Sequence, residues 1–245
     1  MKAFLLAAGL GTRLRPLTDS VPKCLVQVDG TPLLDLWMEA LAAAGVTEVL
    51  VNLHHLPEQV ERHLARRPQP LAVRTVFEPT LLGSAGTLLH NREFVAGEEL
   101  FLAVNADNLT DFDLRLLVEA QRSGSALATL ALFRAPDPTR CGVVEVRDGV
   151  VASFEEKPQH PRGDLANAGL YAFSPDVIDL VRQPLPRDLG GDLLPLLVGR
   201  AHALSIGDAY FIDIGTPDAL ARAEREWARL RRGTLTDAGG RRARG

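Results

Sequence analysis

The chain has 245 residues, of which 46% are hydrophobic, and its formal net charge is -4 at pH 7. This length and composition allow a substantial core and fit one large α/β domain. The negative net charge disfavours a general nucleic-acid-binding protein, which would need a basic surface for phosphate contacts. We therefore expect one domain over residues 1–230, no nucleic-acid partner, and a flexible basic tail over residues 231–245.

The cysteines and the apolar segments indicate the cellular compartment. Cys24 and Cys141 are too few for a disulfide scaffold and lack the CxxC spacing of a zinc or redox site. The apolar run at the start of the chain is short and soon meets Arg13, so it fits a buried strand better than a signal peptide. No stretch of the sequence approaches the length of a membrane span. We expect a soluble, cytoplasmic protein without a membrane partner.

The first half of the chain alternates between strand-like and helix-like patterns. A helix is predicted to open at Thr31-Pro32, with Thr31 as its cap, and to close at Gly45, and a second helix is predicted to start at Pro57. Apolar runs predict strands over residues 3–8, 49–53, 71–77 and 100–104. Such alternation is typical of a doubly wound α/β sheet, in which ligands bind beyond the carboxyl ends of the strands. Residues that directly follow strands are therefore the candidates for a functional site.

The second half of the chain is richer in strand patterns. Helices are predicted over residues 113–122, 175–181 and from Pro217 to about Leu230. Strands are predicted over residues 126–133, 143–146, 150–154, 168–173 and 209–214. Asp148-Gly149 lies between two of these strands and predicts a tight hairpin.

A glycine-rich segment with basic residues directly follows the first predicted strand. It reads Gly9-Leu10-Gly11-Thr12-Arg13-Leu14-Arg15-Pro16-Leu17-Thr18, and Pro22-Lys23 comes a few residues later. Glycines let backbone N–H groups approach phosphate oxygens, while Arg13 adds a bidentate donor and Lys23 a mobile charge. The segment is not a Walker A loop, because no Gly-Lys-Ser/Thr follows, and it is not a dinucleotide fingerprint, because Leu14 stands where the third glycine would be. A plain glycine turn would not require both cations, so the segment predicts an anion site.

Further polar residues stand near the ends of predicted strands. Asp107 and Asp213 could converge on one hard cation, although Asp at such places also serves as a helix cap or turn residue. Gly83-Ser84-Ala85-Gly86 either starts an ordinary helix or lets a nucleoside base or sugar lie close to the backbone. Glu78 either ends a strand or accepts two N–H groups of guanine, which uracil and thymine cannot both offer. Lys157 precedes Pro158, which can hold its ammonium at a fixed place against a sugar phosphate.

Taken together, these segments resemble the nucleotide-sugar pyrophosphorylases, or sugar-phosphate nucleotidyltransferases, and most nearly their mannose-1-phosphate guanylyltransferase-like members. Beyond residues 9–23, the resemblance rests on Leu82-Gly83-Ser84-Ala85-Gly86-Thr87, Asn105-Ala106-Asp107, Phe154-Glu155-Glu156-Lys157-Pro158, Asn167-Ala168-Gly169 and Asp213-Ile214-Gly215-Thr216-Pro217. It covers nearly all of the chain up to about Leu230. It implies an α/β fold with a Rossmann-like doubly wound mixed sheet, the nucleotide-diphospho-sugar transferase or GT-A-like fold.

Two departures from the family pattern stand out. Many relatives place Gly immediately before the metal-binding Asp, whereas this chain has Ala106. Some relatives carry a C-terminal left-handed β-helix domain, and this chain stops too soon for one. We therefore expect no second, acyltransferase activity.

The resemblance implies that a nucleotidyl group passes from an NTP, with GTP favoured, to a sugar 1-phosphate, giving an NDP-sugar and pyrophosphate. It implies Mg²⁺ as cofactor, held by Asp107 and Asp213, and catalytic roles for Arg13, Lys23 and Asp107. The nucleotide-binding residues that we expect are Ala7, Ala8, Gly9, Gly11, Thr12, Glu78, Gly83, Ser84 and Asn105. The sugar-phosphate-binding residues that we expect are Gly86, Glu156, Lys157, Asn167 and Gly169.

Several alternatives stay open at this point. One is the same reaction with UTP, dTTP or CTP, and another is a non-catalytic nucleotide-sugar sensor. A sensor should lack the metal and phosphate residues, whereas Arg13, Lys23, Asp107 and Asp213 are all present. A nicotinamide-dependent dehydrogenase is disfavoured by the missing third glycine. The sugar, which could be a mannose, glucose, heptose, amino sugar or cyclitol, and a homo-oligomeric state are left open.

Overall fold

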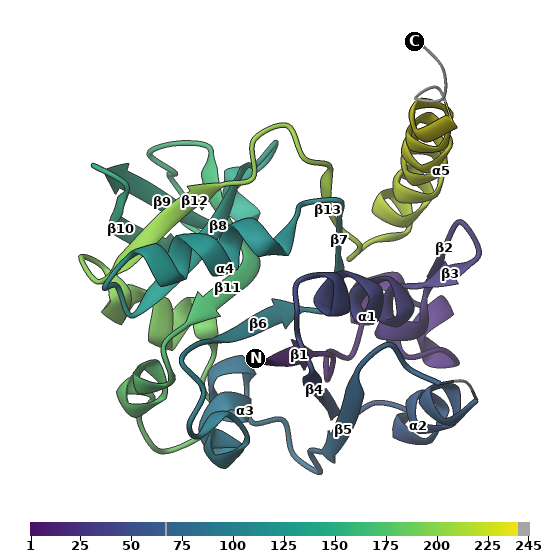
Figure 1. The fold of residues 1–245 in the computed structure, drawn as a ribbon, viewed down its shortest axis with the longest axis horizontal. Coiled ribbons are helices and arrows are strands. Elements are labelled where there is room, and N and C mark those ends of the chain that lie inside the picture. Colours follow the sequence, from purple (N-terminus) through teal and green to yellow (C-terminus); the bar gives the residue numbers. More distant parts are fainter. Residues whose placement is uncertain (67, 240–245) are drawn as a thin grey trace, which may run out of the picture.

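The computed structural model describes residues 1–66 and 68–239, and a mixed β-sheet forms its centre (Figure 1). Within the described residues this sheet has nine strands in the order β5-β4-β1-β6-β11-β8-β12-β10-β9. The strands are β1 (Lys2–Leu6), β4 (Glu48–Leu53), β5 (Ala72–Phe77), β6 (Phe101–Asn105), β8 (Ala128–Arg134), β9 (Gly142–Arg147), β10 (Val150–Glu156), β11 (Leu165–Phe173) and β12 (Ala201–Ser205). Strands β5, β4, β1 and β6 run parallel, and β11 is antiparallel to its neighbours β6 and β8.

Helical segments cover both faces of the sheet, as Figure 1 shows for α1 and α4 on the near side. The α-helices are α1 (Leu33–Ala43), α2 (Pro57–Ala65), α3 (Ser84–His90), α4 (Leu114–Ser123) and α5 (Pro217–Gly239). In β1, Ala3 and Leu5 belong to the core that includes α1 and α4, whereas Phe4 belongs to the core that includes α3. Burial on both faces explains why β1 is a continuous apolar run. The predicted doubly wound mixed α/β sheet is confirmed.

The start of α1 differs from the prediction. Thr31–Pro32 forms strand β3, which pairs with β2 (Gln27–Val28), and α1 begins at Leu33. The prediction that Thr31 caps the helix is wrong, because Pro32 occupies the cap position and no side chain among the described residues caps it. The physical reason is a turn at Asp29-Gly30, where φ angles of 50° and 74° fold the chain into a short hairpin. The predicted hairpin at Asp148-Gly149 is confirmed between β9 and β10.

The last predicted strand lies outside the main sheet. Strand β13 (Phe211–Asp213) pairs antiparallel with β7 (Asn108–Thr110), which the sequence pattern did not predict. Leu109 and Ile212 of this pair share an apolar cluster with Leu14 of the glycine-rich segment and Trp227 of α5. The glycine-rich segment, the β7–β13 pair and α5 are therefore packed together.

The C-terminal helix extends beyond its predicted end. Helix α5 continues to Gly239 rather than ending near Leu230, and residues 240–245 of the predicted tail lie outside the described residues. No helix in the described part of the chain combines the length and apolar character needed to cross a membrane.

Candidate active site

The glycine-rich segment leaves β1 at its carboxyl end and is anchored by buried Leu14. The Thr18 hydroxyl donates a hydrogen bond of 2.7 Å to the Gly11 carbonyl. Gly11 has a φ of 63°, and a Cβ there would lie 2.8 Å from Thr18 Cγ2, so glycine is required. Arg13 remains exposed on this fixed backbone. The segment therefore holds Arg13 at the edge of the sheet where ligands of doubly wound folds bind.

The backbone of the β7–β13 pair brings Asp107 and Asp213 together. Asp107 lies in the turn between β6 and β7, and Asp213 ends β13 opposite Asn108. The Ile214 N–H donates a hydrogen bond of 2.9 Å to the Asp107 carbonyl. The two expected metal ligands, although far apart in the sequence, are thus neighbours at the carboxyl edge of the parallel strands.

The Lys23 ammonium lies between the two carboxylates. Its Nζ is 2.6 Å from Asp107 Oδ2 and 3.7 Å from Asp213 Oδ1, and Arg13 Nη2 is 3.5 Å from Asp213 Oδ2. The Lys23 side chain is 8% exposed, whereas Asp107 and Asp213 are 37% and 50% exposed. The ammonium is therefore the buried member of this cluster, and the carboxylates form its open side. The three expected catalytic residues, Arg13, Lys23 and Asp107, are all in it.

The donor set fits Mg²⁺. Asp107 and Asp213 supply hard carboxylate oxygens, and the described residues contain no group of three or more His, Cys, Asp or Glu placed to hold a metal ion. Mg²⁺ characteristically uses one or two protein carboxylates and completes its coordination with water and substrate phosphates. The position of the Lys23 ammonium shows that a cation is electrostatically favoured between these carboxylates.

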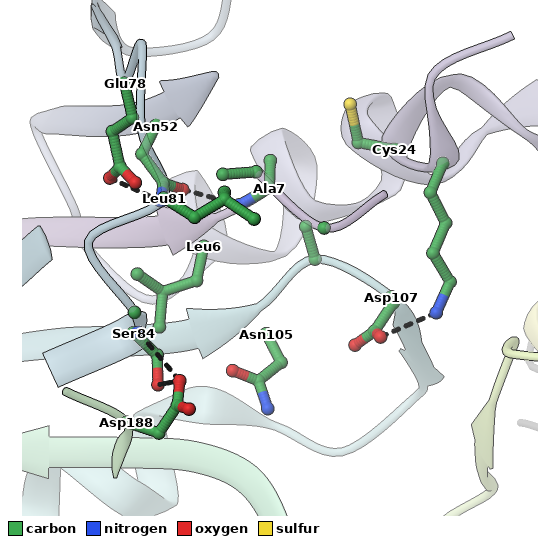
Figure 2. A pocket seen from close by; sticks show the side chains of 15 residues that line it. Leu6, Ala7, Cys24, Asn52, Glu78, Leu81, Ser84, Asn105, Asp107 and Asp188 are labelled. Carbon is green, nitrogen blue, oxygen red and sulfur yellow. Dashed lines mark hydrogen bonds and ion pairs between the residues drawn. The ribbon is translucent and has the colours of Figure 1, made fainter. Parts of the chain in front are cut away.

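A cavity of about 300 Å³ opens beside the cluster (Figure 2), which is within the range of small-molecule sites. Its lining residues are Leu6, Ala7, Ala8, Gly9, Lys23, Cys24, Asn52, Glu78, Leu81, Gly83, Ser84, Asn105, Ala106, Asp107 and Asp188. All of the expected nucleotide-binding residues line it except Gly11 and Thr12. Sequence reasoning missed Asn52 and Asp188, the two further polar side chains in this wall.

Glu78 lies in a buried hydrogen-bond network at one end of the cavity. Its Oε1 accepts hydrogen bonds from Thr87 Oγ1 at 2.6 Å and Asn52 Nδ2 at 3.0 Å, and its Oε2 accepts one from Leu82 N–H at 3.1 Å. Asn52 Oδ1 also accepts the Ala7 N–H at 2.7 Å. Asn52 therefore links Glu78 to the start of the glycine-rich segment. A polar residue within the apolar run 49–53 was the sequence signal for this role.

Lys157 lines a second, larger cavity of about 950 Å³, together with Arg13 and Asp213. Its φ is 48°, and its N–H donates a hydrogen bond of 2.9 Å to the Cys141 carbonyl. The Lys157 side chain is 66% exposed, and its Nζ lies 3.4 Å from Glu156 Oε1. The backbone of Lys157 is therefore held in place, whereas the ammonium, which was expected to be held at a fixed place, belongs to an exposed side chain.

The other expected sugar-phosphate residues are held mainly by protein contacts. Asn167 Nδ2 donates to the Tyr171 hydroxyl at 2.6 Å, and Asn167 Oδ1 accepts the Gly169 N–H at 3.1 Å. Gly169 has a φ of 70°, and a Cβ there would lie 2.5 Å from Asn105 Nδ2. Gly86 is buried inside α3. Among the described residues, Asn167, Gly169 and Gly86 line neither of the two cavities.

The cavity wall also contains a thiol. Burial raises the pKa of the Cys24 thiol to about 12, so it stays protonated at neutral pH. A protonated thiol is a poor nucleophile. The cavity therefore offers charged and polar groups for binding rather than a thiolate for covalent chemistry.

Comparison with known proteins places the chain in a family. The model of the nucleotidyl transferase family matches residues 2–229. Mannose-1-phosphate guanyltransferase beta-B of Xenopus laevis is 35% identical over 224 residues, which cover 89% of this chain and 62% of that protein. A UTP–glucose-1-phosphate uridylyltransferase of Synechocystis is 35% identical over 239 residues, covering 89% of this chain and 61% of that protein. HddC from Yersinia pseudotuberculosis, solved with GMP-PN, has a TM-score of 0.76 at 26% identity, covering 92% of this chain and 99% of that chain.

The mixed sheet and its helices thus have the nucleotide-diphospho-sugar transferase fold. The chain belongs to the nucleotidyl transferase family. This membership confirms the resemblance seen in the motif segments and removes the dehydrogenase alternative. The chain spans about 62% of the length of the guanyltransferase relative.

Proposed function

We propose that the chain transfers a nucleotidyl group from an NTP, preferentially GTP, to a sugar 1-phosphate. The observation that carries this proposal is the cluster of Arg13, Lys23, Asp107 and Asp213 between two cavities. Lys23 and Asp107 line the smaller cavity, and Arg13 and Asp213 line the larger one, which also contains Lys157. A phosphate-handling cluster between two binding spaces suits a reaction that joins two phosphorylated substrates.

The proposed reaction needs no covalent intermediate. An oxygen of the sugar 1-phosphate attacks the α-phosphorus of the NTP and forms the new P–O bond. The bond from the α-phosphorus to the oxygen that bridges to the β-phosphorus breaks, and pyrophosphate leaves with that electron pair. The attacking phosphate is already anionic, so no general base is required. The protein has to align the two substrates and reduce the repulsion between them.

The residues of the cluster divide this work. Lys157 holds the attacking phosphate, while Arg13 and Lys23 stabilise the charge that develops on the leaving pyrophosphate. Asp107 and Asp213 would hold Mg²⁺, which when bound neutralises charge on phosphate oxygens. Lys23 therefore has to move its ammonium from the carboxylates toward the phosphates when substrate binds.

Glu78 does not by itself account for a preference for GTP. Guanine offers two adjacent N–H donors to a carboxylate, whereas uracil and thymine offer one. Glu78 is 2% exposed, its Oε1 accepts hydrogen bonds from Thr87 and Asn52, and its Oε2 accepts one from Leu82 N–H, so it can offer a base one further acceptor and not two. The guanyltransferase relative is consistent with GTP, and the uridylyltransferase relative makes UTP the main competitor.

A matrix of NTPs against sugar 1-phosphates, measured by pyrophosphate release in the presence of Mg²⁺, tests this function. We expect GTP with one of the sugar 1-phosphates to give the highest kcat/KM, with the NDP-sugar identified by mass spectrometry. A higher kcat/KM with UTP would correct the base. Absence of pyrophosphate release from every pair would contradict catalysis and favour the nucleotide-sugar sensor.

Lys157→Ala is expected to raise the KM for the sugar 1-phosphate about tenfold, because a charge-assisted hydrogen bond to the attacking phosphate is lost. The KM for the NTP should stay the same. Steady-state kinetics with each substrate varied in turn measures both constants. Arg147→Ala, at the exposed end of β9, is the matched control for loss of a cation. Unchanged KM and kcat in Lys157→Ala would remove Lys157 from the proposed site.

A further inference from the structure

Asp188 lines the smaller cavity, and the chain on either side of it is bonded to the start of α3. The Arg187 carbonyl accepts hydrogen bonds from Ala85 N–H at 2.9 Å and Gly86 N–H at 3.0 Å, and Arg187 N–H donates to the Leu82 carbonyl at 2.9 Å. Gly83 has a φ of 75°, and a Cβ there would clash with the Arg187 carbonyl. This stretch of chain is therefore fixed to the start of α3 by backbone contacts.

The same contacts orient the Asp188 carboxylate. Its Oδ1 accepts hydrogen bonds from Ser84 N–H at 3.2 Å and Ser84 Oγ at 3.3 Å, and Ser84 Oγ in turn accepts the Leu189 N–H at 2.8 Å. The Asp188 N–H donates to Asp192 Oδ2 at 2.8 Å, and Arg187 pairs with Asp192 Oδ1 at 2.8 Å. The hydrogen bond from the Asp188 N–H has the larger effect and that from Arg187 the smaller, and both lower the pKa of Asp192. Asp192 therefore stays ionised at neutral pH and keeps the turn in place.

The second oxygen of Asp188 has no partner in the described protein, and the residue is exposed. Within residues 1–66 and 68–239, Asp188 Oδ2 has no hydrogen-bond donor, and the side-chain amide of Asn105 has no hydrogen-bond partner. Both residues line the cavity, and Figure 2 shows Asn105 between Asp188 and Asp107. A carboxylate oxygen and an amide offer both acceptors and a donor.

Charge is distributed unevenly along the cavity. The Lys23 ammonium is paired with Asp107, and Figure 2 shows the Glu78 and Asp188 carboxylates away from Asp107. Phosphate groups are attracted to Lys23 and repelled by Asp188. The group that meets Asp188 Oδ2 is therefore not a phosphate, and hydroxyl groups are hydrogen-bond donors that nucleotides and sugar phosphates share.

We propose that Asp188, with Asn105, binds hydroxyl groups of a substrate and thereby sets its specificity. This inference rests on the proposed nucleotidyl transfer. The hydroxyls come either from the ribose of the NTP or from the sugar 1-phosphate. The ribose is one source because Asp188 lines the smaller cavity, which most of the expected nucleotide-binding residues also line. The sugar source follows from Gly190, where a Cβ would lie 2.5 Å from Glu156 Oε2, so the same stretch of chain adjoins a residue expected to bind the sugar.

The test compares the wild type with Asp188→Asn and Ser84→Ala. Asp188→Asn keeps the size of the side chain and an acceptor for Ser84 but removes the negative charge. Ser84→Ala removes one of the two bonds to Asp188 Oδ1 but keeps the carboxylate, and Asp208→Asn, in an exposed loop outside both cavities, is the control for loss of a carboxylate. Kinetics use GTP, 2′-deoxy-GTP and 3′-deoxy-GTP in one arm. The other arm uses the preferred sugar 1-phosphate and its monodeoxy analogues.

We expect Asp188→Asn to lower kcat/KM about tenfold for the substrate that carries the recognised hydroxyl. The analogue lacking that hydroxyl should be used equally by variant and wild type, whereas Ser84→Ala should still discriminate. A change in the GTP arm identifies ribose, and a change in the other arm identifies the sugar. Equal losses for all analogues, or unaltered discrimination in Asp188→Asn, would overturn the proposal.

Calorimetric binding of the same nucleotides and sugar 1-phosphates separates this inference from the proposed function. If the wild type turned over no substrate pair, the proposed function would fail. Binding would still show whether Asp188→Asn loses discrimination against a deoxy analogue. Loss of discrimination in binding supports the role of Asp188, and its retention contradicts it.

Discussion

Asp107→Asn is expected to reduce kcat about 1,000-fold or more while leaving the protein folded. Asp107 is the nearer partner of the Lys23 ammonium, at 2.6 Å, and one of the two carboxylates that fit Mg²⁺. The amide of Asn keeps the shape of the side chain but lacks the negative charge that would hold Mg²⁺ against the phosphates. Phosphoryl-transfer catalysis depends on such a placed cation. Pyrophosphate release under saturating substrates measures the rate.

Two controls make the result for Asp107→Asn specific. Asp208→Asn removes a carboxylate from the exposed loop between β12 and β13 and should keep the wild-type rate. Circular dichroism should show that both variants are folded, with a lower thermal transition for Asp107→Asn, because the buried Lys23 ammonium loses its nearer carboxylate. Near-wild-type activity in Asp107→Asn would exclude Asp107 from the proposed metal site.

Lys23→Met is expected to lower kcat about 100-fold or more and, in contrast, to strengthen metal binding in the absence of nucleotide. The rate falls because a preorganised cation no longer stabilises the leaving pyrophosphate. Metal binding strengthens because the Lys23 ammonium, 2.6 Å and 3.7 Å from the two carboxylates, no longer competes for them. Titration with Mn²⁺, followed by electron paramagnetic resonance, measures the second effect without turnover.

The two effects of Lys23→Met separate its roles. Tighter Mn²⁺ binding with lost activity is the result that the cluster predicts. Weaker Mn²⁺ binding would show that Lys23 holds the carboxylates in place for the metal instead of competing with it. Asp107→Asn provides the comparison, because it should weaken Mn²⁺ binding directly.

The sequence predicted the side of the sheet on which the site lies. Asp107 follows the buried run of β6, and Gly9 follows that of β1, so both stand at the carboxyl ends of adjacent parallel strands. The spacing of Arg13 and Lys23 behind the glycines likewise predicted an anion site. Each of these patterns is local in the sequence. Residues that follow adjacent parallel strands lie at the same edge of the sheet, so the patterns also predict which residues are close in space.

The sequence did not predict how Asp213 reaches Asp107. It places Asp213 at the end of a strand, but β13 pairs with β7 outside the main sheet, and three-residue strands are too short to show a period. Asp188 was missed because it follows Pro184 and Pro186 in a segment without periodic hydrophobicity. Its position depends on backbone bonds between Arg187 and α3, which no sequence pattern records.

Predicted side-chain roles depended on contacts that a sequence does not reveal. The resemblance predicts that Asn167 binds the sugar, but its side-chain amide is hydrogen-bonded to the Tyr171 hydroxyl and the Gly169 N–H. Glu78 reads as a base acceptor, and the structure adds Asn52 and Thr87 as the groups that hold its carboxylate. Both cases reflect the rule that buried polar atoms take partners within the fold.

The pairing of β13 with β7 has a consequence for how activity arises during synthesis. Asp213 joins Asp107 and Lys23 through β13, which follows every other strand of the described residues. A nascent polypeptide that has already folded the residues up to Asp188, which complete the smaller cavity, therefore still lacks one carboxylate of the cluster. Under the proposed function, such a fragment would offer the cavity without one of the two carboxylates proposed to hold Mg²⁺. The order of elements along the chain thus delays completion of the cluster until β13 has been made.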